Sequence, residues 1–400
     1  MTVARSAAGD RSLLRRMNTG AALAVLRAGS QTVTTLAADL GLSRTAVEEI
    51  VRDLLELGWI RAEDDSAGRA RPGRPAKRYV FAAEVGHVAG VDIGVHKVLA
   101  AVADLDGRVL AIRRADVEES DTVQTRFAAA RRVLEEAVAE AGLEPGGVWC
   151  VGVGVPGEVD AEGTVTRYGG VGLPGWAGTD IRGELSAAWS VPVLVESDNN
   201  LGLAAEYWRG SAVGADDVVY ILSGNRTSAA LLIGGRVFRG HNGGAGLVGA
   251  LPELGWAEAP DHVARLSEAG LEPTREAMFR AATAGDPAAA AALDLFARSL
   301  AKGIAAMALA VDPQKIVLGG GVSQGGETIL RPVSGYVDRY AGRPVPLVLS
   351  TLGGDAVAIG ALKLALDHIA AQLERESGTS PGFPRPAAAL GAVEATTRTP

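Results

Sequence analysis

The sequence predicts a mixed α/β protein in which a small helical head precedes a larger body of two lobes. Two observations support this fold class. Three apolar patterns of helical spacing, separated by glycines, come before a basic stretch near residue 70. From residue 88 onwards, short apolar strands alternate with helical segments. A length of 400 residues, with 48% hydrophobic and 22% charged residues, fits two or three packed domains.

Composition limits the classes of function. The 39 Lys and Arg against 47 Asp and Glu give a formal net charge of −8, whereas the first 88 residues carry a small basic excess. A polyanionic partner is therefore expected to meet the head. The single cysteine excludes a disulfide framework and a cysteine zinc site, and we expect neither a metal nor a cofactor. We find no apolar run of the roughly 18 residues that a membrane helix needs and no secretory signal, so we expect a cytoplasmic protein.

The head has the spacing of a helix-turn-helix. A first helix is predicted over Arg11–Arg27, and a second over Val33–Leu40, ended by Gly41. Ser43 is a good N-cap for a third helix, which Gly58 closes before a strand begins. A short helix, a glycine turn and a further helix followed by a strand predict a winged helix-turn-helix.

In that arrangement, the N-terminal side chains of the later helix reach base edges in the major groove of double-stranded DNA. Here those side chains are Ser43, Arg44, Thr45 and Glu48. Glu48 repels phosphate, but a glutamate can accept a hydrogen bond from cytosine N4. The alternative is a small helical bundle that packs on the body without touching DNA.

A basic loop follows the head. Five of the ten residues in Arg69–Arg78 are basic, and prolines and a glycine among them favour an extended chain. We expect Arg71, Arg74 and Lys77 to contact DNA, with Arg74 in a narrow minor groove. A solvated linker between domains is the alternative.

The body contains two rounds of hairpin, helix and strand. Asp106 and Gly107, flanked by apolar runs, predict a hairpin turn, and a helix is expected over Thr122–Ala141. Further strands are predicted over Val148–Val155, Val191–Glu196, Asp217–Ser223, Ala229–Gly234 and Ile316–Leu318. The repetition suggests two related lobes with a cleft between them.

Together these segments resemble the ROK family (repressor, open reading frame, kinase), and the resemblance extends to about Ile369. It is carried by Gly90–Lys97, Gly152–Gly157, Leu173–Trp176, Glu196–Asn200, Arg239–Gly249, Asp312–Ser323 and Leu352–Leu362. The resemblance implies an actin-like, ribonuclease H-like ATPase fold of two lobes. The head and the basic loop match the regulator branch of the family. The kinases of the family carry neither.

The kinase motifs of the family are degenerate in this chain. Asp198 matches the catalytic aspartate and Asp92–Lys97 matches the first phosphate turn. However, Val95 replaces a glycine of that turn, and Leu247 and Ala250 replace the glutamate and histidine that hold the sugar. Loss of two polar anchors makes the pocket apolar and weakens selectivity for a hexose. We therefore expect a vestigial base at Asp198 and no enzyme activity.

The leading hypothesis is a ROK-type transcriptional regulator, acting as a repressor, whose body dimerises and senses a carbohydrate-related ligand. A dimer or tetramer would place its recognition helices on a palindromic operator. The alternatives are an ATP-dependent sugar kinase that kept a DNA-binding head, and a regulator whose body is only an oligomerisation scaffold. The candidate ligand cleft consists of Asp92, Lys97, Gly157, Ser197, Asp198, Leu247 and Ala250.

We predict three segments: a winged helix-turn-helix with its basic loop over residues 1–82, the two-lobed body over 83–372, and a tail over 373–400. The tail has few bulky apolar side chains and several prolines, so we expect it to be disordered.

Overall fold

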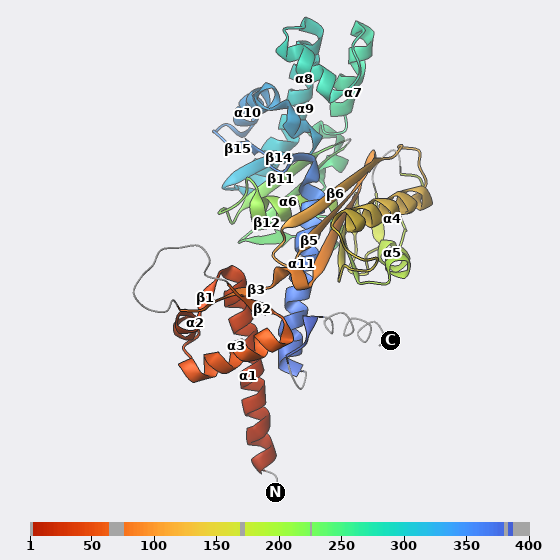
Figure 1. The fold of residues 1–400 in the computed structure, drawn as a ribbon. Helices are drawn as coiled ribbons and strands as arrows, with labels where there is room; N and C mark the ends of the chain where they lie inside the picture. The colour runs from red at the N-terminus through yellow and green to blue at the C-terminus, as the bar shows by residue number, and fades with distance from the viewer. Residues whose placement is uncertain (1–2, 64–75, 169–172, 225, 380–382, 387–400) are drawn as a thin grey trace, which may run out of the picture.

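A computed structural model describes residues 3–63, 76–168, 173–224, 226–379 and 383–386 (Figure 1). The N-terminal head combines three helices with a small antiparallel sheet of order β1-β3-β2. Its elements are α1 (Val3–Ala28), β1 (Gln31–Thr32), α2 (Val33–Leu40), α3 (Arg44–Leu57), β2 (Ile60–Ala62) and β3 (Arg78–Phe81).

The helix boundaries of the head follow from local capping. The Thr32 side chain accepts a hydrogen bond from the Thr35 amide at 3.1 Å at the start of α2, and Gly41 ends that helix with a left-handed φ of 64°. Ser43 caps α3, and Gly58 closes it with φ 87°. The predicted second and third helices are thus confirmed, whereas α1 begins earlier than predicted, at Val3.

The first lobe of the body is built on a five-stranded sheet of order β10-β7-β4-β5-β6. Helix α4 packs on one face of this sheet and α11 on the other. The elements are β4 (His87–Ile93), β5 (Lys97–Asp104), β6 (Val109–Asp116), α4 (Val123–Glu140), β7 (Val151–Val155), β8 (Glu158–Val159), β9 (Val165–Arg167), α5 (Ile181–Trp189) and β10 (Val193–Ser197). The predicted hairpin is confirmed, since β5 and β6 pair antiparallel around Gly107, whose φ is 76°.

The second lobe repeats the plan with a five-stranded sheet of order β13-β12-β11-β14-β15. Helix α9 is largely buried and forms the centre of this lobe's core. The elements are α6 (Asp198–Arg209), β11 (Val218–Ser223), β12 (Thr227–Ile233), β13 (Arg236–Phe238), α7 (Ala259–Ala264), α8 (Arg275–Thr283), α9 (Pro287–Val311), β14 (Lys315–Gly319), α10 (Glu327–Ala341), β15 (Leu347–Leu349) and α11 (Ala356–Thr379). Short 3₁₀ turns occur at Ala83–Val85, Val248–Ala250, Pro252–Leu254, Arg265–Ala269, Gly321–Gly325 and Gly353–Asp355. The five body strands predicted from the sequence are all present, with ends shifted by up to three residues.

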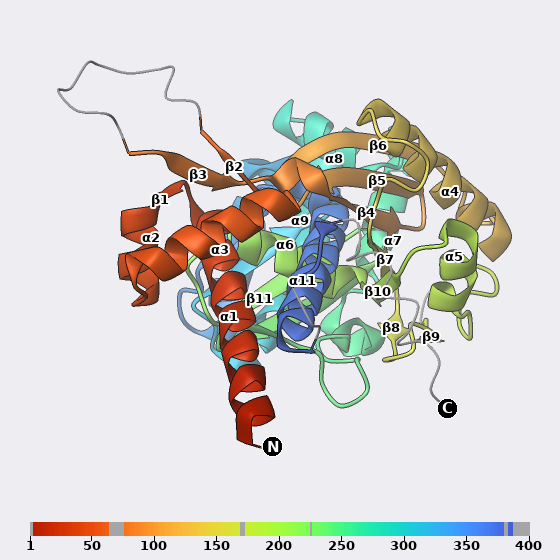
Figure 2. The same ribbon diagram turned by 60° about the horizontal axis from the view of Figure 1, so that its bottom comes forward.

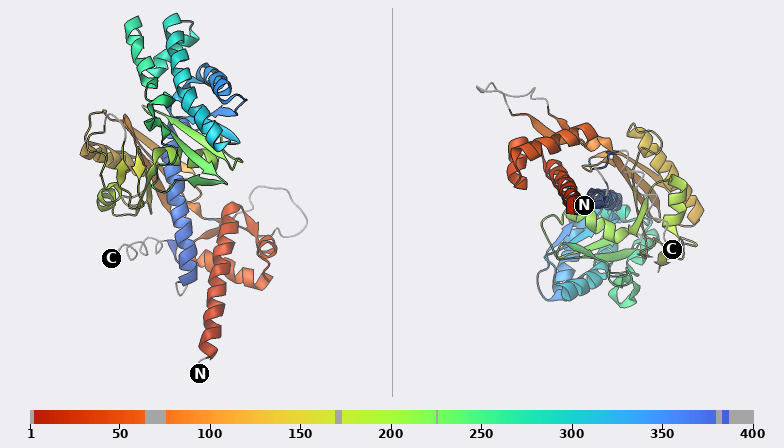
Figure 3. Two further views of the ribbon diagram at one scale, coloured as in Figure 1. Left: turned by 180° about the vertical axis from the view of Figure 1, so that it is seen from behind. Right: turned by 90° about the horizontal axis from the view of Figure 1, so that it is seen from below.

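Helix α11 connects the lobes to the head. It packs on α6, on strands β4 and β7, and on α1 (Figure 2). Glycines permit this close approach: a Cβ on Gly152 would lie 2.1 Å from the Ala361 carbonyl oxygen, and a Cβ on Gly360 would lie 1.9 Å from the Leu201 carbonyl oxygen. Views from behind and below show α11 running out of the body beside α1 (Figure 3). One helix therefore touches both the head and α6, which begins at Asp198.

The C-terminal part differs from the expected disordered tail. Helix α11 continues past residue 372 to Thr379, with Leu373 buried at 8% exposure. Phe383 stacks edge-on against Trp59, whose Nε1 donates a hydrogen bond to the Pro384 carbonyl oxygen at 2.7 Å. The expectation was wrong for residues 373–379 because this end of the helix packs beside the head rather than in the body. Residues 387–400 lie outside the described part of the chain.

Within the described chain, one helix, Gly353–Glu376, is long and apolar enough to cross a membrane. In this fold, 61% of its most apolar window is buried inside the protein, so it is a core helix.

Candidate nucleic-acid interface and ligand cleft

Helix α3 exposes one polar face. Ser43, Arg44, Thr45 and Glu48 are all exposed, while Val47, Ile50, Val51 and Leu54 are buried against the rest of the head. The Arg44 Nε donates to the Glu48 carboxylate at 2.9 Å, and the Arg44 side chain is 72% exposed. The structure thus brings the four predicted base-reading residues together on the accessible beginning of one helix.

Two further residues of α3, Arg52 and Glu49, help to define the charge of this exposed face. Arg52 lies one turn beyond Glu48 and is exposed, although the sequence analysis did not select it; its spacing of four residues from Glu48 was the available signal. Glu49, in contrast, faces α1, where the Arg15 guanidinium lies 3.5 Å from Glu49 and 2.7 Å from Asp53. Arg15 therefore balances two acidic side chains that would otherwise repel a phosphate backbone.

The basic loop is only partly within the described chain. Arg71 and Arg74 lie outside the described residues. Lys77 is exposed, and its Nζ lies 5.7 Å from the centroid of the Tyr79 ring. The next residue, Arg78, pairs with Glu63 at 3.6 Å across the β2–β3 pair. Lys77 thus carries the basic stretch up to the start of β3.

In the body, Asp92 and Lys97 form an ion pair at the first turn. The Lys97 Nζ lies 3.3 Å from Asp92 and also donates to the Gly354 carbonyl oxygen. Burial raises the pKa of Asp92, although Lys97 opposes that rise. The Gly94 amide is bonded to the Lys97 carbonyl oxygen at 2.9 Å. The charge of Lys97 and one amide of the turn are therefore already engaged within the protein.

Asp198 is the first residue of α6 and is partly open to solvent. Its carboxylate accepts a hydrogen bond from the Asn199 amide at 2.7 Å. Burial and the nearby negative charge of Asp92 raise the pKa of Asp198 to about 7. The preceding Ser197 is buried and donates to Glu196 at 3.2 Å. Asp92, Lys97 and Asp198 thus form one electrostatic cluster.

The remaining predicted cleft residues, Gly157, Leu247 and Ala250, bring no polar side chain to the cleft. Gly157 adopts φ 115°, and a Cβ there would lie 2.6 Å from the Arg167 carbonyl oxygen. Leu247 is half-buried and Ala250 is exposed, on the stretch that follows Arg239. Arg239 is held by an ion pair with Glu196. Leu247 and Ala250 present no polar group that could anchor a sugar hydroxyl.

We expect the substitution Asp198→Asn to stabilise the protein in a pH-dependent way. The folded-state pKa of Asp198, about 7, lies above the ordinary value of about 3.9. Folding therefore favours the protonated carboxyl of Asp198. This stabilisation is fully present below about pH 4 and is lost as the pH rises towards 7, where the native carboxyl ionises. At pH 8 the variant should melt about 2–4 °C higher than wild type, and at pH 3.5 the two should coincide. Equal melting shifts at both pH values in calorimetry would contradict this account.

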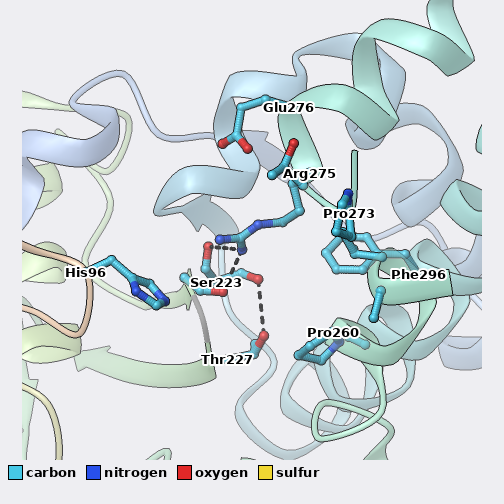
Figure 4. Close-up of a pocket in the computed structure, with 13 residues that line it drawn as sticks. His96, Ser223, Thr227, Pro260, Pro273, Arg275, Glu276 and Phe296 are labelled. Atoms are coloured by element: carbon cyan, nitrogen blue, oxygen red, sulfur yellow. Dashed lines mark hydrogen bonds between the residues drawn. The ribbon is translucent and has the colours of Figure 1, made fainter. Parts of the chain in front are cut away.

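A separate cavity of about 350 Å³ is lined by His96 from the first lobe and otherwise by residues of the second (Figure 4). None of the seven predicted cleft residues lines it. Its walls are formed by His96, Ser223, Gly224, Thr227, Ala259, Pro260, Val263, Ala264, Pro273, Thr274, Arg275, Glu276 and Phe296. No local sequence pattern indicated that the beginning of α8, with Arg275, would line the same cavity as Ser223 and Thr227.

The turn at Ser223 and Gly224 points its carbonyl groups at a cation. The Arg275 Nη1 donates to the Ser223 oxygen at 3.3 Å and to the Gly224 oxygen at 2.5 Å. The Gly224 amide is bonded to the Arg226 carbonyl oxygen at 2.9 Å. A phosphate cradle needs converging free N–H groups, whereas this turn presents carbonyl oxygens.

Comparison with known proteins decides the family. The ROK family profile matches residues 88–253 and 262–368. The chain belongs to the ROK family. The match covers both lobes and stops short of the head, so the family assignment rests on the body alone. The fold is correspondingly mixed α/β with an actin-like sugar-kinase body.

Relatives of this ROK protein include both regulators and kinases. The DNA-binding transcriptional dual regulator NagC of Escherichia coli is 24% identical over 89% of this chain and 94% of its own length. The xylose repressor of Bacillus subtilis is 22% identical over 82% of this chain and 89% of its own. A glucokinase of Halalkalibacterium halodurans is 29% identical, but over 52% of this chain and 74% of its own.

Solved structures similar to this chain also include both regulators and kinases. A ROK family transcriptional regulator homologous to the Escherichia coli MLC protein superposes with a TM-score of 0.65 and 21% identity, covering 88% of this chain and 97% of its own. A ROK glucokinase from Streptomyces griseus superposes with a TM-score of 0.60 and 27% identity, covering 70% of this chain and all of its own. These regulators match more of this chain than these kinases do.

Proposed function

We propose that this ROK protein is a cytoplasmic DNA-binding transcriptional regulator, acting as a repressor. The observation that carries the proposal is the exposed row Ser43, Arg44, Thr45 and Glu48 at the start of α3. It follows a short helix and a left-handed glycine, as in a helix whose N-terminal residues read the major groove. The regulator relatives match 82%, 89% and 88% of this chain, more than the glucokinases do, and support the same reading.

The small antiparallel sheet of the head is a second observation in favour of a winged helix-turn-helix. Strands β2 and β3 pair antiparallel, with Ile60 opposite Phe81, so the basic segment between them would form the wing of a winged helix-turn-helix. In this proposal Arg71, Arg74 and Lys77 contact the backbone and the minor groove beside the bases that α3 reads. The domain limits proposed are residues 1–82 for this unit and 83–372 for the body.

Regulation requires that the body be coupled to the head. We propose a homo-oligomer, a dimer or tetramer, that sets two α3 helices about 34 Å apart, or a multiple of that spacing, on a palindromic operator. Helix α11 offers a direct mechanical connection, because it packs on both α6 and α1. A sugar-derived effector that favours one arrangement of the lobes would then change the spacing of the helices. A body that binds no ligand and only oligomerises is the competing version.

Genome-wide mapping of DNA bound to the full-length protein tests this function. We expect a small set of sites that share an inverted repeat and retain binding at physiological salt. Failure to retain any genomic fragment, even at low ionic strength, would overturn the proposal.

A sugar kinase is the second candidate. One observation favours it: Asp198 has a pKa of about 7 and lies near Asp92, as a general base would. Against it stand the engaged Lys97 and the carbonyl-lined turn at Ser223.

We expect no turnover above background in a coupled ADP-release assay over a panel of hexoses and amino sugars, with a ROK glucokinase as positive control. Asp198→Asn should leave this background unchanged. Turnover by the wild type that Asp198→Asn abolishes would reverse the ranking of the two functions.

A further inference from the structure

The turn that joins β5 to β6 is held together by its own hydrogen bonds. The buried carboxylate of Asp104 accepts hydrogen bonds from the Asp106 amide at 3.1 Å and from the Arg108 amide at 2.9 Å. The Gly107 amide donates to the Asp104 carbonyl oxygen at 2.8 Å. An aspartate that bonds the backbone ahead of it in this way fixes the shape of a turn. This hairpin turn, residues 104–108, is therefore expected to move as one unit.

Two arginines from distant parts of the chain bind the hairpin turn through its carbonyl groups. Arg209 donates from Nη2 to the Asp106 carbonyl oxygen at 3.0 Å and from Nη1 to that of Gly107. Arg27 donates from Nη2 to the Leu105 carbonyl oxygen at 2.8 Å. Three consecutive carbonyl groups are thus shared between two guanidinium groups.

The first of these contacts connects the hairpin turn to the head. Arg27 lies in the last turn of α1, and its guanidinium carbon is 5.3 Å from the centroid of the Phe81 ring on β3. The Leu105 amide also donates to the carbonyl oxygen of Ala83, just after the head, at 3.1 Å. Leu105 is buried in one cluster with residues of α1 and α3. The hairpin turn belongs to the first lobe in sequence but packs against the head.

The second contact connects the hairpin turn to the second lobe. Arg209 is the last residue of α6, a helix of 12 residues that begins at Asp198 and is about 18 Å long. The fully buried Glu206 fixes this end of the helix, because its carboxylate accepts hydrogen bonds from the Ser211 amide at 2.6 Å and the Leu352 amide at 3.3 Å. One rigid helix therefore runs from the electrostatic cluster at Asp198 to the hairpin turn.

Trp208 packs the same end of α6 against the hairpin turn. The Arg209 guanidinium carbon lies 3.7 Å from the centroid of the Trp208 ring. A Cβ on Gly107 would lie 2.5 Å from that ring, so a glycine is needed for this close approach. A displacement of α6 along its axis moves both the ring and the guanidinium. The hairpin turn must then follow the helix or lose both contacts.

We propose that Arg209 and Arg27 are positioning residues of the head, coupled through the hairpin turn, so that a displacement of α6 in the body shifts α1 in the head. The inference rests on the proposed function in one respect, because the head that moves would be the part that reads DNA. It is distinct from the connection through α11, since it depends on these two arginines. The coupling must act equally in both directions, as any coupling free energy between two sites does.

Hydrogen–deuterium exchange of the full-length protein, followed by mass spectrometry of its peptides, tests the coupling without ligand or DNA. Arg209→Gln should accelerate exchange in the last turn of α1 about 3- to 10-fold, because loss of charge-assisted bonds loosens the hairpin turn that Arg27 holds. Arg27→Gln should accelerate exchange in the last turn of α6 by a similar factor. Acceleration confined to the mutated helix and the hairpin turn would overturn the proposal.

Arg113→Gln is the matched control. It removes an exposed arginine of the first lobe that pairs with Glu140 of α4 at 2.8 Å, so exchange in the last turns of α1 and α6 should stay within about 2-fold of wild type. In the double variant of Arg27 and Arg209, the acceleration should be smaller than the product of the two single effects. Accelerations that multiply would show two independent contacts and contradict the coupling.

A second variant covers the case in which Arg209→Gln destabilises the whole protein. Arg209→Lys keeps the charge but lacks the planar pair of donors that bonds two adjacent carbonyl groups. It should accelerate exchange in the last turn of α1 less than Arg209→Gln but more than Arg113→Gln. Exchange in α1 equal to that of the control would contradict the role of Arg209.

These measurements use no DNA, so they separate the two proposals. Exchange coupling in a protein that ignores genomic DNA would contradict the regulator alone. Operator binding by a protein that shows no exchange coupling would contradict the hairpin connection alone.

Discussion

Replacing Arg44 by alanine is expected to weaken binding to the specific operator by about 1–3 kcal/mol, while non-specific DNA binding falls much less. Arg44 is the first residue of α3 and its side chain is 72% exposed. Its bond to Glu48 holds the guanidinium over the helix surface. On DNA, that bond would exchange for a pair of hydrogen bonds to a guanine edge, which gives the interaction its dependence on sequence.

Arg52→Ala provides the matched control, because it removes an exposed arginine from the same helix further from the N-terminus. We expect Arg52 to meet phosphate, so its loss should weaken all sequences about equally and reduce the slope of log affinity against log salt by about one. Electrophoretic mobility shifts with operator and scrambled duplexes at several salt concentrations measure both effects. If Arg44→Ala weakened both duplexes equally, Arg44 would only neutralise phosphate.

The head shows what local sequence signals can predict. The ends of α2 and α3 follow from Gly41, Ser43 and Gly58, whose effects act over one turn of helix. The exposed face of α3 follows from helical periodicity. The pairing of Arg15 with Glu49 could not be predicted in this way, because it depends on how α1 crosses α3. Tertiary packing, rather than propensity, decides which acidic side chains remain free to face DNA.

In the body, local sequence signals predict less of the candidate site than they do in the head. The ion pair between Asp92 and Lys97 lies within the segment that the sequence analysis matched to the first phosphate turn. Arg275 is separated from Gly224 by more than fifty residues of chain, and no local pattern near Pro273 or Thr274 marks it as part of a cavity. The prediction of a disordered tail was wrong for the same reason, because Phe383 packs against Trp59, which is more than three hundred residues away in the sequence.

Trp59 lies where the head, the body and the C-terminal segment meet. It is fully buried between α3 and β2, and its ring centroid lies 6.4 Å from that of Phe81 and 6.2 Å from that of Trp149. Phe383 covers a third side at 6.3 Å, and the indole N–H is bonded to the Pro384 oxygen. One side chain thus packs against three parts of the chain that are distant in sequence.

We expect Trp59→Ala to cost about 3–5 kcal/mol of stability, since it leaves a cavity among aromatic rings. The loss should uncouple the head from the body, so that calorimetry shows a low-temperature transition for the head followed by one for the body. Phe383→Ala should cost less, because Phe81 and Trp149 still enclose the indole ring. Phe238 is an aromatic residue on β13 with 47% exposure and serves as the control, so Phe238→Ala should change stability by no more than about 0.5 kcal/mol. A single transition within one or two degrees of wild type in Trp59→Ala would show that the junction does not depend on this ring. Because Trp59 directly follows the glycine that ends α3, a loosened junction should also weaken operator binding in proportion to the fraction of heads that remain folded.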